Sequence, residues 1–139
     1  MRTKAYQSNF DEEVLTANPL KLVHLLYRGA LDSIASARRY LRLGDIRARS
    51  RAISKAMGIV TELSLSLNQT EGGELSRNLA ELYAYVQTLL IKANTEQCDP
   101  PLAEAEQLLG TLADAWDSCA QAAAPVVRQE EDEPVGCAY

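Results

Sequence analysis

The residue types that could carry out chemistry are few and widely spread in this sequence. A single histidine, His24, lies inside a stretch of helical periodicity, and no nucleophile is suggested beside it. Glu104 and Glu106 are two residues apart, which on a helix points them to different faces. Neither the Glu-x-x-His pair of a di-iron bundle nor a phosphate-binding glycine loop is present. We therefore expect no catalytic site, no metal and no cofactor, and the sequence does not predict an enzyme.

The cysteines and the overall hydropathy point to a reducing compartment. Cys98, Cys119 and Cys137 are odd in number and widely spaced, which fits neither a disulfide framework nor a metal site. No cleavable signal and no transmembrane run is visible. A cytoplasmic protein with no membrane insertion is the expectation.

The charge is small overall but unevenly placed. The net charge of −5 argues against general affinity for nucleic acid. Basic residues concentrate between Lys21 and Lys55, whereas the segment from Glu96 to Tyr139 is strongly acidic. We interpret the asymmetry as solvated helix faces that attract one another, with a dedicated anion site as the alternative.

Helical periodicity first appears after residues 16–18, where Asn18 can cap a helix that begins at Pro19. This first helix is expected to run to about Leu43. Gly44 then suits the left-handed position beyond a helix end, and Asp45 can cap a second helix that runs to about Leu67. A connection this short places the two helices side by side and antiparallel.

Two more helices follow, separated by clear breaks at Gly72-Gly73 and at Asp99, which precedes two prolines. The apolar residues expected to form buried seams on the second, third and fourth helices are Ile46, Ile53, Ala56, Val60, Leu63 and Leu67; Leu75, Leu79, Leu82, Val86, Leu89 and Ala93; and Leu102, Ala105, Leu109, Leu112, Trp116 and Cys119. Arg49 interrupts the second seam, and Pro125 is expected to end the periodic region.

Together these patterns predict an all-α fold, an antiparallel up-down-up-down four-helix bundle spanning residues 18–124. Residues 1–17 lack sustained periodicity and are expected to form a mobile N-terminal arm. Residues 125–139 contain an acidic run and are expected to form a disordered tail.

Several apolar residues are left over once each helix has buried one seam. They are Leu22, Leu26, Met57, Leu65, Tyr83, Tyr85 and Leu90. Core packing is the alternative for any one of them, but a broad apolar surface on a monomer usually has a use. We expect Met57, Leu65, Tyr83 and Tyr85 to border a common groove for a partner between the second and third helices.

Two segments carry a family resemblance. The run LTANPLKLVHLLYRGAL, residues 15–31, resembles the opening helix of the flagellin-binding export chaperones of the FliS family, and GGELSRNLAELYAYV, residues 72–86, resembles its third helix. Tyr6 and Gln7 resemble the Tyr-Gln of the family's N-terminal segment, which implies that they contact the client or cover its site.

The resemblance implies a flagellin-specific export chaperone with no enzymatic activity. Its partners would be the disordered C-terminal region of flagellin and the flagellar export apparatus, and its role would be to prevent premature polymerisation and assist export. Two alternatives stay open: a self-associating structural or regulatory helical bundle, with a homodimer as one form, and a metal-dependent bundle enzyme.

Overall fold

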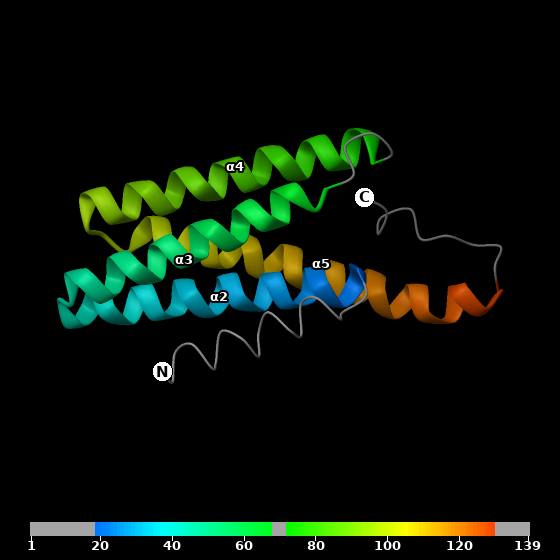
Figure 1. Cartoon of the computed structure of the whole chain (residues 1–139), viewed down its shortest axis with the longest axis horizontal. Coiled ribbons are helices and arrows are strands. Elements are labelled where there is room, and N and C mark those ends of the chain that lie inside the picture. The colour runs from blue at the N-terminus through cyan, green and yellow to red at the C-terminus, as the bar shows by residue number, and fades with distance from the viewer. Residues whose placement is uncertain (1–18, 68–71, 130–139) are drawn as a thin grey trace.

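The computed structural model describes residues 19–67 and 72–129 of the chain. Four helices make up this part: α2 (Pro19–Leu43), α3 (Ile46–Leu65), α4 (Gly73–Glu96) and α5 (Pro100–Gln129) (Figure 1). The predicted all-α class is confirmed. The expected arm, residues 1–17, lies outside the described residues, as does most of the expected tail.

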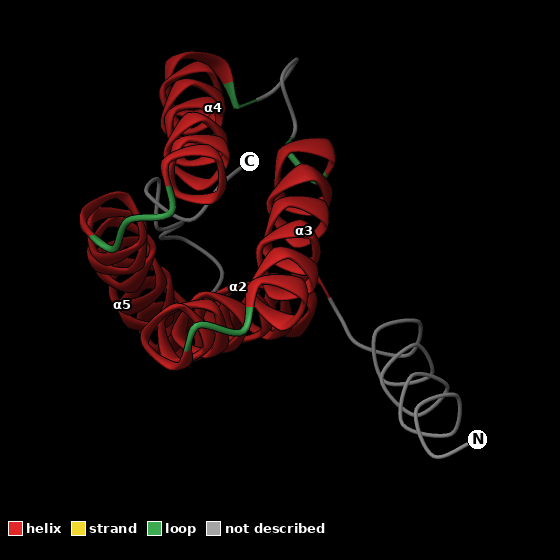
Figure 2. Cartoon of the chain, turned by 90° about the vertical axis from the view of Figure 1, so that its left-hand side faces the viewer, coloured by secondary structure: helices red, strands yellow, loops and turns green. Residues whose placement is uncertain are grey.

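The helices form the predicted bundle, with consecutive helices running in opposite directions (Figure 1). Seen end-on, they occupy the four corners of the bundle in chain order (Figure 2). Helix α2 packs against α3 and α5, and α4 packs against the same two neighbours from the opposite corner. The up-down-up-down topology is therefore confirmed.

Short polar sequences set the helix ends. Gly44 has φ +75°, and the Asp45 carboxylate accepts a hydrogen bond from the Ala48 amide at 3.1 Å, as the sequence predicts for the end of α2 and the start of α3. The end of α5 differs from the expectation, because the helix continues through Pro125 to Gln129.

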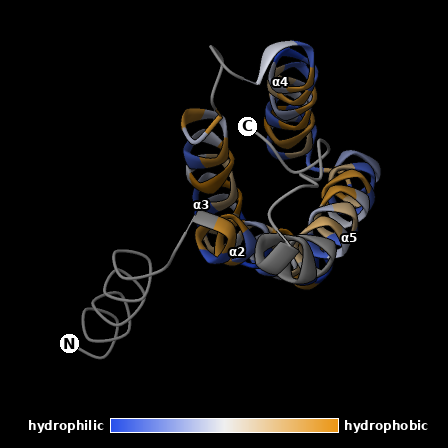
Figure 3. Ribbon diagram, turned by 90° about the vertical axis from the view of Figure 1, so that its right-hand side faces the viewer, coloured by the Kyte–Doolittle hydropathy of each residue, from blue (hydrophilic) through white to orange (hydrophobic). Residues whose placement is uncertain are grey.

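The apolar faces of the helices turn toward the bundle axis (Figure 3). Tyr27 and Ile34 of α2 and Leu63 of α3 lie within this core. Helices α2 and α3 approach closely at Gly29, where an added Cβ would lie 3.1 Å from Cδ1 of Ile59. A side chain at position 29 would require the end of the Ile59 side chain to shift by a few tenths of an ångström.

The buried face of α4 differs from the predicted seam in the first half of the helix, whereas Val86, Leu89 and Ala93 are buried as predicted. Its fully buried members include Tyr83 and Leu90, which the sequence pattern placed off the seam, and that prediction is wrong. Conversely, Leu75, Leu79 and Leu82 are only partly buried. The difference is possible because Ser76 faces inward with no exposed area, so its small side chain admits the neighbouring helices.

The first turn of α3 also differs from its predicted seam. Ile46 is exposed, whereas Arg49 is only 4% exposed. The Arg49 guanidinium donates hydrogen bonds to Oδ1 of Asn94 at 3.3 Å and to Oε1 of Gln97 at 3.5 Å. It lies at the C-terminal end of α4, where the helix dipole favours a cation.

An ion-pair cluster joins α2 to the start of α5. Arg38 donates two hydrogen bonds to the Asp99 carboxylate, at 2.8 and 2.9 Å, and a third to Glu106 at 2.5 Å. The Asp99 carboxylate, directly before the start of α5, is thus held by Arg38. This bidentate pair fixes the α2–α5 contact at the end of the bundle that carries the α2–α3 turn.

A candidate binding surface between helices α4 and α5

An apolar cavity of about 120 Å³ opens between the first half of α4 and the middle of α5. Its lining residues come from three helices: Tyr27 of α2, Leu75 and Leu79 of α4, and Leu112, Ala115, Trp116 and Cys119 of α5. Tyr27 is buried, whereas every lining residue of α4 and α5 is half-buried or exposed. The cavity is thus an open, apolar concavity on the side of the bundle.

The lengths of the helices explain why the cavity is open. Helix α5 has 30 residues against 24 in α4, and it extends beyond its neighbours (Figure 1). Residues of the α5 seam up to Leu109 are fully buried, but Leu112, Trp116 and Cys119 are not. Trp116 was expected to be buried by other helices, but it is only partly buried against the core.

Polar contacts hold the edge of the cavity in place. The Trp116 indole Nε1–H donates to the Leu20 carbonyl oxygen at 3.4 Å, which ties the ring to the first turn of α2. His24 Nδ1 lies 3.0 Å from Asp117 Oδ1, and both side chains are nearly half exposed. The apolar surface is thereby flanked by a polar rim, as in many protein interfaces.

Three of the predicted partner-binding residues lie in the core. Leu26 is 6% exposed, and Tyr83 and Leu90 have no exposed area. The Tyr83 hydroxyl lies 2.7 Å from the Tyr27 hydroxyl. The expectation that these residues are left over on the surface is wrong, because the core face of α4 includes Tyr83 and Leu90, and α2 buries a wide apolar face.

The other described candidates do not border one groove. Tyr85 is exposed and donates a hydrogen bond to Glu104 of α5. Met57 of α3 is partly buried against the core, and its carbonyl oxygen accepts from Nε2 of Gln87 of α4 at 2.9 Å. Leu65 is 73% exposed at the end of α3, and Leu22 is partly buried against the core. The predicted common groove between α3 and α4 is therefore not formed by these residues.

Comparison with known proteins identifies the family. The model of the family described as "Flagellar protein FliS" matches residues 2–123. The chain belongs to the FliS family. The resemblance seen in residues 15–31 and 72–86 is confirmed.

Three relatives in this FliS family indicate the breadth of the similarity. The flagellar secretion chaperone FliS of Salmonella typhimurium is 38% identical, over 81% of this chain and 85% of the relative. The flagellar secretion chaperone FliSB of Pseudomonas aeruginosa is 36% identical, over 82% and 91%. The FliS of Bacillus subtilis is 33% identical, over 84% of each chain. The protein is thus a flagellar export chaperone.

The residues that line the cavity of this FliS-family chain were predicted to be buried core residues. Leu75, Leu79, Leu112, Trp116 and Cys119 all belong to predicted buried seams. No signal in the sequence indicated that these seam positions lack full cover, because the fourth helix was expected to end at Pro125. The predicted contacts Tyr6 and Gln7 lie outside the described residues.

Within residues 19–67 and 72–129, no helix is both long and apolar enough to cross a membrane. No cluster of three or more His, Cys, Asp or Glu side chains suited to a metal ion occurs in that part of the FliS-family chain. The candidate site is an apolar surface that is flanked by a polar rim.

Proposed function

We propose that this chaperone binds the C-terminal region of flagellin in the cytoplasm, prevents its premature polymerisation and assists its delivery to the export apparatus. The observation that carries the proposal is the open apolar cavity between α4 and α5. A bundle that exposes a concavity lined by leucine, tryptophan and tyrosine suits an amphipathic segment, which docks through apolar anchors at helical spacing.

The energetics of the cavity fit a client that orders when it binds. Burial of apolar surface contributes about 25 cal/mol per Å², and ordering a disordered segment costs several kcal/mol. A cavity of about 120 Å³ accepts one large apolar side chain. The remaining free energy must come from surface beyond the cavity, for which Leu22, Met57, Leu65 and Tyr85 stay predictions.

The arm is proposed to regulate the same site. Helix α2 begins at Pro19, and the carbonyl of the next residue, Leu20, accepts the hydrogen bond from Trp116. Helix α2 therefore begins at the rim of the cavity, and residues 1–17 precede this point in the sequence. A competing arm predicts tighter flagellin binding after deletion of residues 1–17, whereas a direct contact through Tyr6 or Gln7 predicts weaker binding.

Calorimetric titration with the C-terminal segment of flagellin tests the proposal. Trp116→Ala should weaken binding at least tenfold, which corresponds to about 1.4 kcal/mol. Leu43→Ala is the matched control, because Leu43 is exposed at the far end of α2. Binding should show a negative heat-capacity change and should survive moderate salt.

A folded protein that fails to bind would contradict the flagellin proposal. Circular dichroism must show that each variant is folded, since Trp116 also contacts the core. A folded, monodisperse wild-type protein that does not bind this segment would refute the flagellin proposal. Concentration-dependent association of that protein would then favour the self-associating bundle.

A further inference from the structure

A second concavity, of about 570 Å³, lies on the opposite part of the molecule, along the outer groove between α2 and α3. Its walls combine charged and hydroxyl groups with small apolar side chains. They comprise Asp32, Ser33, Ser36 and Tyr40 from α2 and Ala48, Arg51, Ala52 and Lys55 from α3. We call these eight residues the α2–α3 groove.

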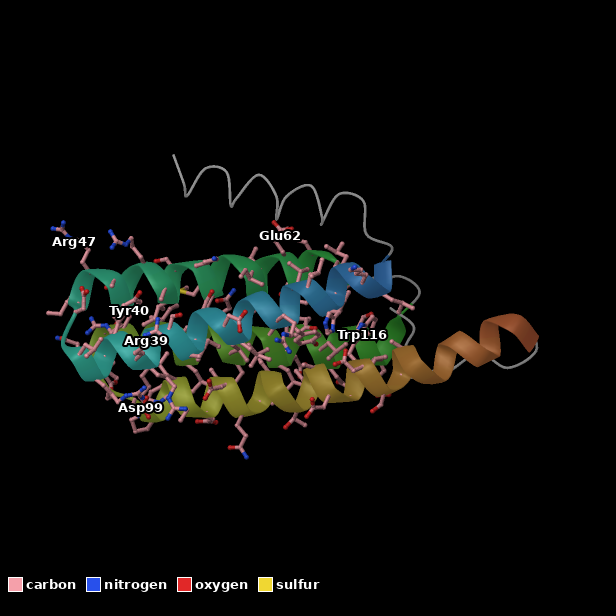
Figure 4. The ribbon with its side chains drawn as sticks, turned by 90° about the horizontal axis from the view of Figure 1, so that it is seen from below. Arg39, Tyr40, Arg47, Glu62, Asp99 and Trp116 are labelled. Carbon is pink, nitrogen blue, oxygen red and sulfur yellow. The ribbon has the colours of Figure 1, made fainter. Side chains whose placement is uncertain are left out.

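The groove is rich in hydrogen-bond donors and in positive charge. Arg51 and Lys55 are exposed along the α3 wall, and the hydroxyls of Ser36 and Tyr40 face them from α2. Arg39 stacks over the Tyr40 ring, with its guanidinium carbon 5.1 Å from the ring centroid. Figure 4 shows Arg39, Tyr40, Arg47 and Asp99 toward the end of the bundle opposite Trp116, and of these four only Tyr40 lines the groove.

These cations lack carboxylate partners in the described part of the chain. Arg51 and Lys55 form no ion pair there, whereas nearby Arg38 is neutralised by both Asp99 and Glu106. Asp32 is the single acidic side chain in the lining, at one end of the groove. Because the whole chain has a net charge of −5, this cationic surface is a local feature and not a reflection of overall composition.

The chain's own acidic run cannot fill the groove within one molecule. Arg38 contacts Asp99, so the α2–α3 groove lies level with the start of α5. Helix α5 has 30 residues and is about 45 Å long. Acidic residues 130–133 directly follow its far end and reach about 14 Å at full extension. The C-terminal acidic run is therefore excluded as an occupant of the groove within one molecule.

We propose that the α2–α3 groove docks an acidic segment of a partner protein. Arginine and lysine on one wall and hydroxyl donors on the other suit a row of carboxylates, with the acidic groups placed away from Asp32. This surface is separate from the cavity between α4 and α5, so the chaperone can hold a client and an acidic partner at once. The inference does not depend on the proposed flagellin site.

Titration with a capped twelve-residue peptide that carries six glutamates tests the proposal. The peptide with glutamine at all six positions is its control. Arg51→Glu combined with Lys55→Glu should weaken binding at least tenfold at 50 mM salt. Arg28→Glu combined with Arg77→Glu changes the net charge equally outside the groove and should weaken it less than threefold. Asp32→Asn should tighten binding several-fold.

Four results would overturn the proposal. An equal loss in both double variants would mean that only the overall field matters. No binding of the glutamate peptide would remove the site. Tighter binding of a twelve-nucleotide oligouridylate would indicate a nucleic-acid surface instead. A tenfold gain in affinity on removal of residues 1–17, or of residues 130–139, would assign the groove to one of the chain's own acidic segments.

Discussion

The hydroxyl pair of Tyr27 and Tyr83 is the main polar contact inside the apolar core. The two oxygens lie 2.7 Å apart, and the rings are tilted by 60° with centroids 6.5 Å apart. Burial raises the pKa of Tyr27, and the hydrogen bond from Tyr83 opposes this shift in part. Each hydroxyl therefore satisfies a group that would otherwise be costly to bury.

This pair predicts a coupling energy. Tyr27→Phe leaves the Tyr83 hydroxyl without that contact, and Tyr83→Phe does the reverse, so each should lower the free energy of unfolding by about 1–3 kcal/mol. The double variant should lose less than the sum, with a coupling of about 1 kcal/mol in urea denaturation. Strictly additive losses would show that the hydroxyls do not stabilise one another.

The pair of Arg38 and Asp99 predicts a pH dependence. Hydrogen bonds from Arg38 lower the pKa of Asp99 from its usual 3.8, despite partial desolvation. A lowered pKa in the folded state means that the stabilisation is complete above pH 3.8 and is lost as the pH falls through the folded value.

Unfolding of the wild-type protein should therefore become easier below about pH 4, and Asp99→Asn should flatten this part of the profile. Asp114→Asn, at an exposed position of α5, is the matched control. Identical profiles for the wild type and Asp99→Asn would show that this ion pair contributes nothing to acid unfolding.

Capping and turn preferences predicted individual residues correctly where the local backbone conformation alone determines the residue type. Gly44 and Asp45 were identified from sequence because a left-handed residue and a cap act within four residues of each other. Arg49 and Tyr83 were not, because their burial depends on partners 45 and 56 residues away. No periodicity rule places an arginine inside a helical seam.

At the scale of the element, α4 shows how helix phase is decided by neighbours. Two apolar stripes compete on this helix, one through Leu75, Leu79 and Leu82 and the other through Tyr83 and Leu90. The first belongs to the seam that was predicted from helical spacing. The second is buried, since α2 offers Tyr27 as a hydrogen-bond partner for Tyr83.

The phase of α4 can be measured by paired truncations. Leu90→Ala removes a fully buried side chain and should cost about 2–5 kcal/mol of unfolding free energy. Leu82→Ala truncates a partly buried side chain and should cost at least 1 kcal/mol less. Chemical denaturation of both variants decides the phase, and the reverse order would restore the sequence-based seam.

As a whole, the molecule has one end fixed by polar contacts and another that is open and apolar. At the α2–α3 turn, Arg38 joins α2 to α5 and Arg49 joins α3 to α4. Toward the other end, Leu79 and Trp116 are only half-buried around the cavity. The bundle topology was predictable from helix count and short turns, but this asymmetry depends on unequal helix lengths and on long-range polar partners.

The asymmetry predicts a gradient of local stability along α4. Amides of residues 89–92 should exchange with deuterium at least tenfold more slowly than those of residues 79–82, because local opening follows the density of buried contacts. Arg49→Ala should speed exchange at residues 89–92, and Leu43→Ala should not. Uniform exchange along α4 would mean that the bundle opens as a single unit.

Trp116 is the sole tryptophan of the chain, and it lines the cavity between α4 and α5. Its indole is partly exposed to water in the unbound bundle. An apolar side chain that enters the cavity must displace this water, so the intrinsic fluorescence of the protein should shift to shorter wavelength on binding. An occupant of the α2–α3 groove should leave the emission unchanged. The protein thus carries an internal optical reporter that distinguishes its two surfaces without any label.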